Sequence, residues 1–249
     1  DSIDSTNIRA KLEAEQGAES GLLVVSDMQS AGRGRRGRGW ESPAGTNIYY
    51  TLMLKPDFSS DCAPMLTLVM ALAVAKGIRQ TLRRDSEEAA AKVGIKWPND
   101  IVVDGKKVCG ILTEMSMEQG YIQHIVIGVG INVRKQEFPE EIRDRAAAID
   151  EQCGFRISRS QLIADIMEAF EEDYEIFLRT HDLKGLRASY AELLVNQDRE
   201  VCVLDPKGEY RGIARGINDQ GELLVERQDG TVEEVYAGEV SVRGIYGYV

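Results

Sequence analysis

The chain has 249 residues, 43% of them hydrophobic and 29% charged, and its formal net charge is −11 at pH 7. This length suffices for one large domain, or for one of about 150–200 residues with a small second one. The acidic balance disfavours non-specific binding of nucleic acid. No run of 18 apolar residues occurs, and the N-terminal stretch DSIDSTN does not resemble a signal peptide, which predicts a soluble, cytoplasmic protein that binds no membrane.

The first third of the chain is predicted to hold a short helix and two strands. Ser5 or Thr6 caps a helix over about Ile8–Ala14. The runs LLVVS at residues 22–26 and TNIYYTLML at residues 46–54 have the apolar, β-branched composition of buried strands. The segment between them is therefore a loop inserted between two strands of a sheet.

That loop contains the stretch GRGRRGRGW, Gly32 to Trp40, which places four arginines on a flexible backbone. Its glycines disfavour a helix and weaken a strand. A guanidinium group stays charged at physiological pH and pairs with carboxylate and phosphate oxygens, so the loop is expected to bind an anionic ligand. From this stretch alone, a solvated loop and an arm that holds RNA remain alternatives.

The middle of the chain predicts a core helix followed by a sheet. The elements expected are a long apolar helix at 64–84, a surface helix or loop at 86–92, two strands flanking an Asp104–Gly105 turn at 96–115, and a third strand at 121–133. Gly128 and Gly130 lie within that third strand. Glycine at such positions suggests the close approach of a ligand or of other backbone.

The last part of the chain predicts helices and then short strands. The elements expected are a short helix and loop at 139–148, amphipathic helices at 161–179 and 183–195, and five short strands from residue 199 onward. This change from helices to short strands predicts a domain boundary near Asn196–Asp198, followed by a small β-barrel. The four cysteines lie more than forty residues apart and the two histidines are isolated. Neither a metal site nor a Ser-His or Cys-His nucleophile is therefore assigned.

Five motifs occur in a fixed order along the chain. They are STN at residues 5–7, Gln29 ahead of GRGRRGRGW, KWPNDI at 96–101, KKVCGILTE at 106–114 and GVGIN at 128–132. In this combination the sequence resembles the biotin–protein ligases over essentially its whole length. The N-terminal helix-turn-helix domain that some members carry is missing from it, so the chain is a short form or that domain lies upstream.

The resemblance implies an α+β fold with a mixed or antiparallel sheet and packed helices. This catalytic domain, of the class II aminoacyl-tRNA synthetase-like kind, would span residues 1–196, and a small SH3-like β-barrel would span residues 197–249. The implied reaction uses ATP and Mg²⁺ to convert biotin to biotinyl-5′-AMP and then transfers biotin to a lysine of a biotin carboxyl carrier domain. The chain is expected to form a homodimer and to bind no nucleic acid. The alternatives are a lipoate or octanoate ligase of the same fold and a nucleic-acid-binding protein that uses the arginine loop.

The resemblance also assigns site residues. Those matched to biotin contacts are Ser5, Thr6, Asn7, Gln29, Arg33, Gly34, Arg35 and Lys107. Those matched to the nucleotide side are Arg38, Trp40, Asn99, Asp100 and Asn132, and Gly110 and Gly130 complete the ligand-binding set.

Arg35, Lys107 and Asp100 are the catalytic candidates. The two cations would offset the repulsion between a carboxylate and a phosphate. Asp100 would hold Mg²⁺ or orient the acceptor lysine, and the sequence leaves both roles open. Lys107 is preferred to Lys106 because it lies three residues before Gly110, and because strand alternation puts Lys106 on the opposite face.

Overall fold

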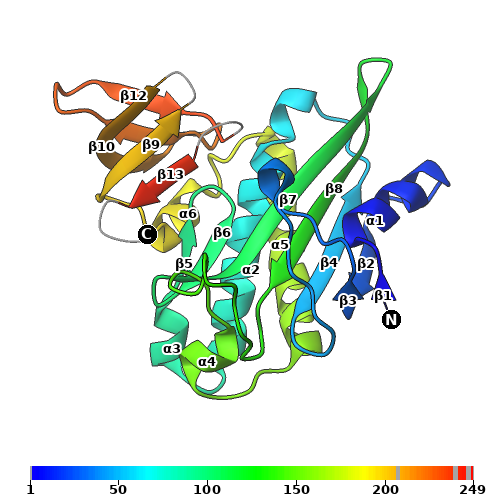
Figure 1. The fold of residues 1–249 in the computed structure, drawn as a ribbon. Helices are drawn as coiled ribbons and strands as arrows, with labels where there is room; N and C mark the ends of the chain where they lie inside the picture. The colour runs from blue at the N-terminus through cyan, green and yellow to red at the C-terminus, as the bar shows by residue number, and fades with distance from the viewer. Residues whose placement is uncertain (1, 206–207, 238–240, 245–247, 249) are drawn as a thin grey trace.

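A six-stranded antiparallel sheet forms the centre of the larger part of the molecule (Figure 1). The structure is a computed structural model that describes residues 2–205, 208–237, 241–244 and 248. The strands run in the order β2-β4-β8-β7-β6-β5. Their bounds are β2 Leu22–Ser26, β4 Ile48–Leu54, β5 Val93–Lys96, β6 Asp100–Val103, β7 Lys106–Glu118 and β8 Tyr121–Ile131. β7 and β8 form a long hairpin whose turn projects beyond the sheet (Figure 1).

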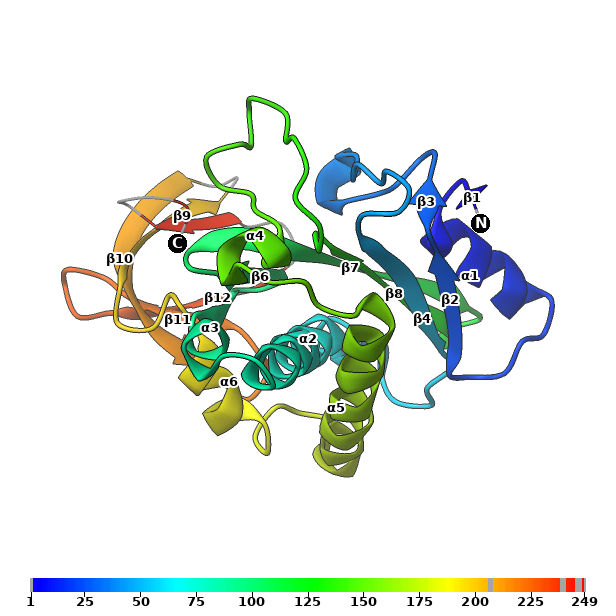
Figure 2. The same ribbon diagram turned by 90° about the horizontal axis from the view of Figure 1, so that it is seen from below.

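Helices cover both faces of this sheet (Figure 2). They are α1 Thr6–Glu15, α2 Met65–Arg83, α3 Glu87–Ala91, α4 Ile149–Cys153, α5 Arg159–Thr180 and α6 Arg187–Leu193. Strand alternation divides the core in two. Leu52 and Leu54 of β4 point into the large core that includes α2, whereas Met53 points to α1 and packs with Ala10 and Ala14.

The helix α2 is the core helix that the sequence predicts. By length and composition it could cross a membrane, but most of its span is buried inside the fold. Val69, Met70, Ala71 and Leu72, four consecutive residues that point to different sides of the helix, are all fully buried. A helix that is apolar all round is explained by burial between a sheet and another helix, here α5.

A five-stranded antiparallel sheet follows the helices, which confirms the predicted small all-β C-terminal part. Its strands are β9 Glu200–Asp205, β10 Gly208–Ile217, β11 Leu223–Glu226, β12 Val232–Val235 and β13 Ser241–Gly244, in the order β12-β11-β10-β9-β13. Gly238–Val240, which the sequence assigned to the last strand, lie outside the described residues. The indole Nε1 of Trp97 donates to the Gly221 carbonyl at 3.0 Å, so this sheet is joined directly to the turn between β5 and β6.

Two helix predictions were wrong. Residues 139–148 form turns and no helix, because the backbone there pairs with the start of β7: the Lys107 N–H donates to the Arg145 carbonyl and the Ala147 N–H to the Lys107 carbonyl. Helix α6 begins at Arg187, not at Leu183: residues 184–186 form a turn, and the Leu183 N–H ahead of it donates to the Asp219 carbonyl in the turn between β10 and β11. Both differences come from contacts between segments distant in sequence.

Candidate functional site

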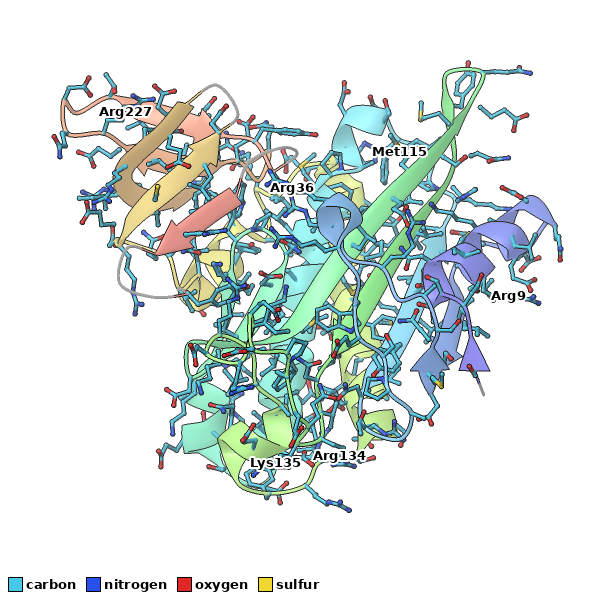
Figure 3. All side chains as sticks on the ribbon, in the orientation of Figure 1. Arg9, Arg36, Met115, Arg134, Lys135 and Arg227 are labelled. Atoms are coloured by element: carbon cyan, nitrogen blue, oxygen red, sulfur yellow. The ribbon has the colours of Figure 1, made fainter. Side chains whose placement is uncertain are left out.

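The arginine loop, residues 32–40, is folded back on itself. The Trp40 N–H donates to the Gly32 carbonyl at 2.9 Å and the Gly34 N–H to the Arg38 carbonyl at 2.8 Å, closing the loop around a 3-10 turn, Arg35–Gly37. Arg36, labelled in Figure 3, takes the left-handed conformation with φ of 58° and is exposed. The predicted loop is therefore present, but its hydrogen bonds aim its arginines in different directions.

Two arginines of this loop reach partners far apart on the sheet. Arg33 lies 3.4 Å from a carboxylate oxygen of Glu114, near the middle of β7. Arg35 donates to the side-chain oxygen of Asn99 at 2.7 Å and to the carbonyl of Ala237 at 2.6 Å. Arg35 thus bridges the turn that precedes β6 and the C-terminal sheet.

The start of α1 builds a polar cluster, which we call the N-terminal cluster: Thr6, Asn7, Gln29, Ser42 and Thr51. Gln29 Oε1 accepts from the Thr6 N–H at 2.8 Å and from its hydroxyl at 3.1 Å, and Gln29 Nε2 donates to Ser42 Oγ at 2.9 Å. Thr51, on β4, donates to Asn7 Oδ1 at 2.7 Å. Ser5, the residue before α1, is buried beside this cluster but makes no side-chain cap.

Asn7 is held from both sides. Its Nδ2 donates to Glu114 Oε2 at 2.8 Å. A Cβ atom at Gly128 would lie 2.0 Å from Asn7 Oδ1, so only glycine leaves room for this amide. Burial raises the pKa of Glu114, but hydrogen bonds from Asn7 and Lys11 outweigh it, so the net pKa is lowered and the carboxylate stays ionised.

Trp40 covers two glycines that face each other across the sheet. Gly110 of β7 and Gly130 of β8 are paired in register. Added Cβ atoms would lie 2.9 Å from Trp40 Cζ3 at Gly110 and 2.4 Å from its Nε1 at Gly130. The close approach that Gly128 and Gly130 predicted is real, and here side chains of the same chain make it. The indole Nε1–H of Trp40 is buried and has no acceptor among the described residues.

A second group, the Asp100 cluster, comprises Lys96, Asp100, Lys107 and Tyr248. Asp100 Oδ1 lies 2.5 Å from Lys107 Nζ, and the Tyr248 hydroxyl donates to Asp100 Oδ2. Lys96, opposite Asp100 in the β5–β6 pair, places its Nζ 3.5 Å from the centre of the Tyr248 ring. Lys107, as predicted, points toward the site, whereas Lys106 is exposed.

Electrostatics in this cluster follow from burial and crowding of cations. Burial raises the pKa of Asp100, but the charge and hydrogen bond of Lys107 outweigh it, and the net pKa is lowered. Lys96 is only 6% exposed, and burial lowers its pKa to about 8 although the Asp100 charge opposes this. The charges of Arg145 and Arg243 also act on Lys96.

Sequence reasoning missed several residues in and around the two clusters. Ser42, Thr51 and Arg145 lie outside the motifs, and Arg243 and Tyr248 come from the C-terminal part. Lys96 lies inside the motif KWPNDI and Glu114 inside KKVCGILTE, so the sequence could have identified both as site residues. Only folding brings the other residues to the same place.

The remaining site residues predicted from sequence lie around these clusters. Arg38 is exposed on the arginine loop, and its charge acts on Tyr248. Asn99 donates its Nδ2 to the Ile111 carbonyl at 3.1 Å, which fixes it next to Gly110. Asn132 is buried at the end of β8, where Gln136 donates to it at 3.4 Å, so it lies with the 133–148 segment instead of contacting Asp100 directly.

The two clusters meet at Trp40. Its carbonyl accepts from Ser42 of the N-terminal cluster at 3.0 Å, and its ring centre lies 5.5 Å from Lys107 Nζ. One end of the site therefore offers uncharged amides and hydroxyls, and the other offers cations around one carboxylate. Among the described residues, no group of three or more His, Cys, Asp or Glu side chains could hold a metal ion alone.

The arrangement suits a ligand with a neutral polar end and an anionic end, and comparison with known proteins gives the class. The Biotin/lipoate A/B protein ligase family profile matches residues 1–132, and that of the Biotin protein ligase C terminal domain matches residues 198–243. The chain belongs to the biotin/lipoate protein ligase family.

Relatives and solved structures agree with this assignment. The bifunctional ligase/repressor BirA of Bacillus spizizenii is 37% identical over 97% of this chain and 72% of its own length. The biotin–[acetyl-CoA-carboxylase] ligase of Paracoccus denitrificans is 30% identical over 94% of this chain and 98% of its own length. The structure of the Aquifex aeolicus biotin protein ligase in complex with biotin and ATP aligns with a TM-score of 0.81 at 29% identity, covering 98% of this chain and 96% of that one.

Proposed function

We propose that this chain activates biotin with ATP to biotinyl-5′-AMP and transfers biotin to a lysine of a biotin carboxyl carrier domain. The observation that carries the proposal is the junction at Trp40, where an uncharged hydrogen-bonding cluster meets a cationic one. A ligand with a neutral polar head and a carboxylate tail fits across such a junction. Relatives named biotin–protein ligases support the same reaction.

The N-terminal cluster suits the ureido ring of biotin. A urea presents one carbonyl acceptor and two N–H donors, and Thr6, Asn7 and Gln29 offer both donors and acceptors without net charge. Buried polar groups that recognise such a ring reject a ligand that lacks it, because their hydrogen bonds would be left unmade. This favours biotin over lipoate or octanoate, which have no urea.

The Asp100 cluster suits the reacting carboxylate and phosphate. Lys107, next to Gly110, and Arg35 are positioned to contact anionic oxygens near Trp40. Lys96, Arg145 and Arg243 add positive charge around the same point. Fixed cations offset the repulsion between biotin carboxylate and ATP and stabilise the charge that grows on the α-phosphate. Neither step needs an enzyme nucleophile.

Mg²⁺ is proposed to enter with ATP. Mg²⁺ is commonly bound by one or two carboxylates together with substrate phosphates, and Asp100 is an ionised carboxylate surrounded by cations. Asp100 therefore fits as the protein ligand of MgATP. The ion would supply further neutralisation of the phosphate charge.

Three further features are proposed. The catalytic domain would end at residue 196 and the C-terminal domain begin at 197, which the start of β9 at Glu200 supports. The protein would act in the cytoplasm as a homodimer. Arg33 and Arg35 are engaged with side chains of the same chain, which favours a small anionic ligand over nucleic acid.

Pyrophosphate release tests the proposal. Biotin with MgATP and no acceptor should release one pyrophosphate per site in a burst, and addition of a carrier domain should discharge the adenylate. Lys107→Ala should slow the burst, and Lys106→Ala, its exposed neighbour, is the matched control. If folded protein shows no biotin-dependent burst, or if RNA binds and biotin does not, the assignment is wrong.

A further inference from the structure

Tyr248 occupies the centre of the Asp100 cluster. Its hydroxyl donates to Asp100 Oδ2, and its ring covers the ammonium of Lys96 at 3.5 Å. The other oxygen of Asp100 is taken by Lys107. Both oxygens of the only carboxylate assigned to MgATP are therefore engaged by the chain itself.

The surroundings of Tyr248 are those of an anion site. Lys96 lies under its ring, and the charges of Arg38 and Arg145 act on its phenol. A neutral ring replaces the hydration of the Lys96 ammonium, but it neutralises none of that charge. Phosphate oxygens would pair with these cations directly, so the position filled by Tyr248 favours a polyphosphate.

We propose that Tyr248 is a plug that holds the ATP-phosphate position in the free protein and leaves it when MgATP binds. This rests on the proposed function. In the proposed function the Lys96 ammonium would pair with the phosphates of MgATP and Asp100 would hold its Mg²⁺, and Tyr248 contacts both groups. Tyr248 and MgATP therefore exclude each other.

A second contact joins the same two parts of the protein. Arg35 donates to the carbonyl of Ala237, just after β12, while it holds Asn99. Arg35 is also assigned to the reacting carboxylate, so ligand binding draws on this contact as well as on that of Tyr248. Release of Tyr248 is thus coupled to the position of the C-terminal sheet relative to the arginine loop.

If Tyr248 is a plug, removing its side chain should increase the affinity for MgATP. When a binding-competent state is only fractionally populated, the apparent Kd equals the intrinsic Kd divided by that fraction, and so it rises. A hydrogen bond to a charged acceptor corresponds to about ten- to a hundredfold in an equilibrium constant. Tyr248→Ala should therefore bind MgATP about tenfold or more tightly than the parent, and Tyr248→Phe, which keeps the ring on Lys96, should fall between them.

Isothermal titration calorimetry with MgATP in the absence of biotin measures this effect without any reaction. The biotin Kd should be unchanged in both variants, which also reports that the N-terminal cluster is folded. In steady state, the KM for ATP should fall in both variants. Tyr236→Ala is the matched control, because Tyr236 is a 53% exposed tyrosine of the same C-terminal part.

The outcomes separate this inference from the proposed function. If the parent protein shows no biotin-dependent pyrophosphate release, the proposed function fails. If the parent is active but Tyr248→Ala and Tyr248→Phe bind MgATP equally well or more weakly, Tyr248 supports the nucleotide and the plug is wrong. If the variants only transfer biotin to the carrier faster and their MgATP Kd is unchanged, the plug is also wrong.

Discussion

Three glycines of the central hairpin serve as space for side chains. Gly110, Gly128 and Gly130 all have ordinary backbone conformations, so no left-handed geometry demands glycine there. What they share is a side chain pressed against the strand: Asn7 over Gly128, and Trp40 over the other two. The glycine motif GVGIN is thus explained by packing of the site residues on the sheet.

Gly128→Ala should therefore displace Asn7. The added Cβ would meet Asn7 Oδ1 at 2.0 Å, and overpacking of this kind costs about 1–3 kcal/mol of unfolding free energy. The affinity for biotin should fall as well, because Asn7 is assigned to biotin. Denaturant unfolding and biotin titration measure the two effects.

The double variant with Asn7→Ala provides the control. If the clash is the cause, Gly128→Ala should cost almost nothing more in the Asn7→Ala background, because the partner is gone. Equal costs in both backgrounds would show that the clash with Asn7 is not the reason for glycine.

Arg35→Gly should separate formation of the adenylate from its retention. The mixed anhydride reacts with any amine, so it must be held until the carrier docks. Loss of a charge-assisted contact is expected to weaken retention by about tenfold to over a hundredfold. The variant should leak biotinyl-5′-AMP and label serum albumin on a streptavidin blot, whereas Lys107→Ala should mainly slow adenylation. If the variant forms the adenylate but leaves albumin unlabelled, Arg35 is not the residue that retains the adenylate.

Residues in motifs could be placed from sequence, and residues outside them could not. Strand alternation predicted that Lys107, and not Lys106, faces the site; Lys107 contacts Asp100 and Lys106 is exposed, although the register between β6 and β7 shifts between Lys107 and Cys109. Tyr248 and Arg145 carry no local pattern, and they join the site only because the C-terminal part and the 133–148 segment fold against β6 and β7.

At the scale of elements, α1 rests on a strand that contains a buried histidine. His124 of β8 is 1% exposed, and neither of its ring nitrogens has a partner among the described residues. Burial lowers its pKa below the ordinary value; the charge of Glu15 opposes this, and Lys11 and Lys55 add to it. The folded state therefore favours the neutral ring.

Protonation of His124 should destabilise the fold at mildly acid pH. Because the folded pKa is the lower one, the unfolded chain binds the proton first as the pH falls below about 6.5. The free energy of unfolding should then decrease by up to about 1.4 kcal/mol per pH unit until the folded pKa is reached. Urea unfolding between pH 7.5 and 5 measures this slope.

Two variants assign the slope to one residue. His124→Leu should reduce it, whereas His181→Asn, which removes the other histidine and tolerates its left-handed conformation, should keep it. If both variants retain the slope, other groups cause it.

The long elements were predictable because their pattern is local. The buried strands β4 and β8 and the helices α2 and α5 follow from apolar periodicity. The short parallel pair of β1 Ser2–Ile3 and β3 Met28–Gln29 was not predicted, since two residues carry no periodicity. The absence of a helix at 139–148 and the late start of α6 likewise involve partners distant in sequence.

At the scale of the whole molecule, the two sheets share one core. Val201, Val203 and Leu223 of the C-terminal sheet belong to the same buried cluster as α2 and β6. Contacts from Arg35 and Tyr248 add polar links across the same boundary. The C-terminal part is thus packed beside the site, where it could influence ligand binding.

The strand β2 ends the six-stranded sheet on one side and is the expected surface for self-association. The other end, β5, is capped by the Val195 N–H, which donates to the Ile95 carbonyl at 3.0 Å. Edge strands present backbone groups that can pair with a second copy. Val25, 51% exposed on β2, lies just before the arginine loop, so ligand binding in that loop should stabilise this edge.

Light scattering with biotin and MgATP should therefore give twice the chain mass of 27.6 kDa. Val25→Lys should return the mass to that of one chain, because a charge on an edge strand opposes pairing. Val232→Lys is the matched control: Val232 is 54% exposed on β12, the end strand of the C-terminal sheet, and its replacement should leave the dimer intact. A dimer lost in Val232→Lys and kept in Val25→Lys would move the interface to the C-terminal sheet. A monomer under every condition would remove the homodimer altogether.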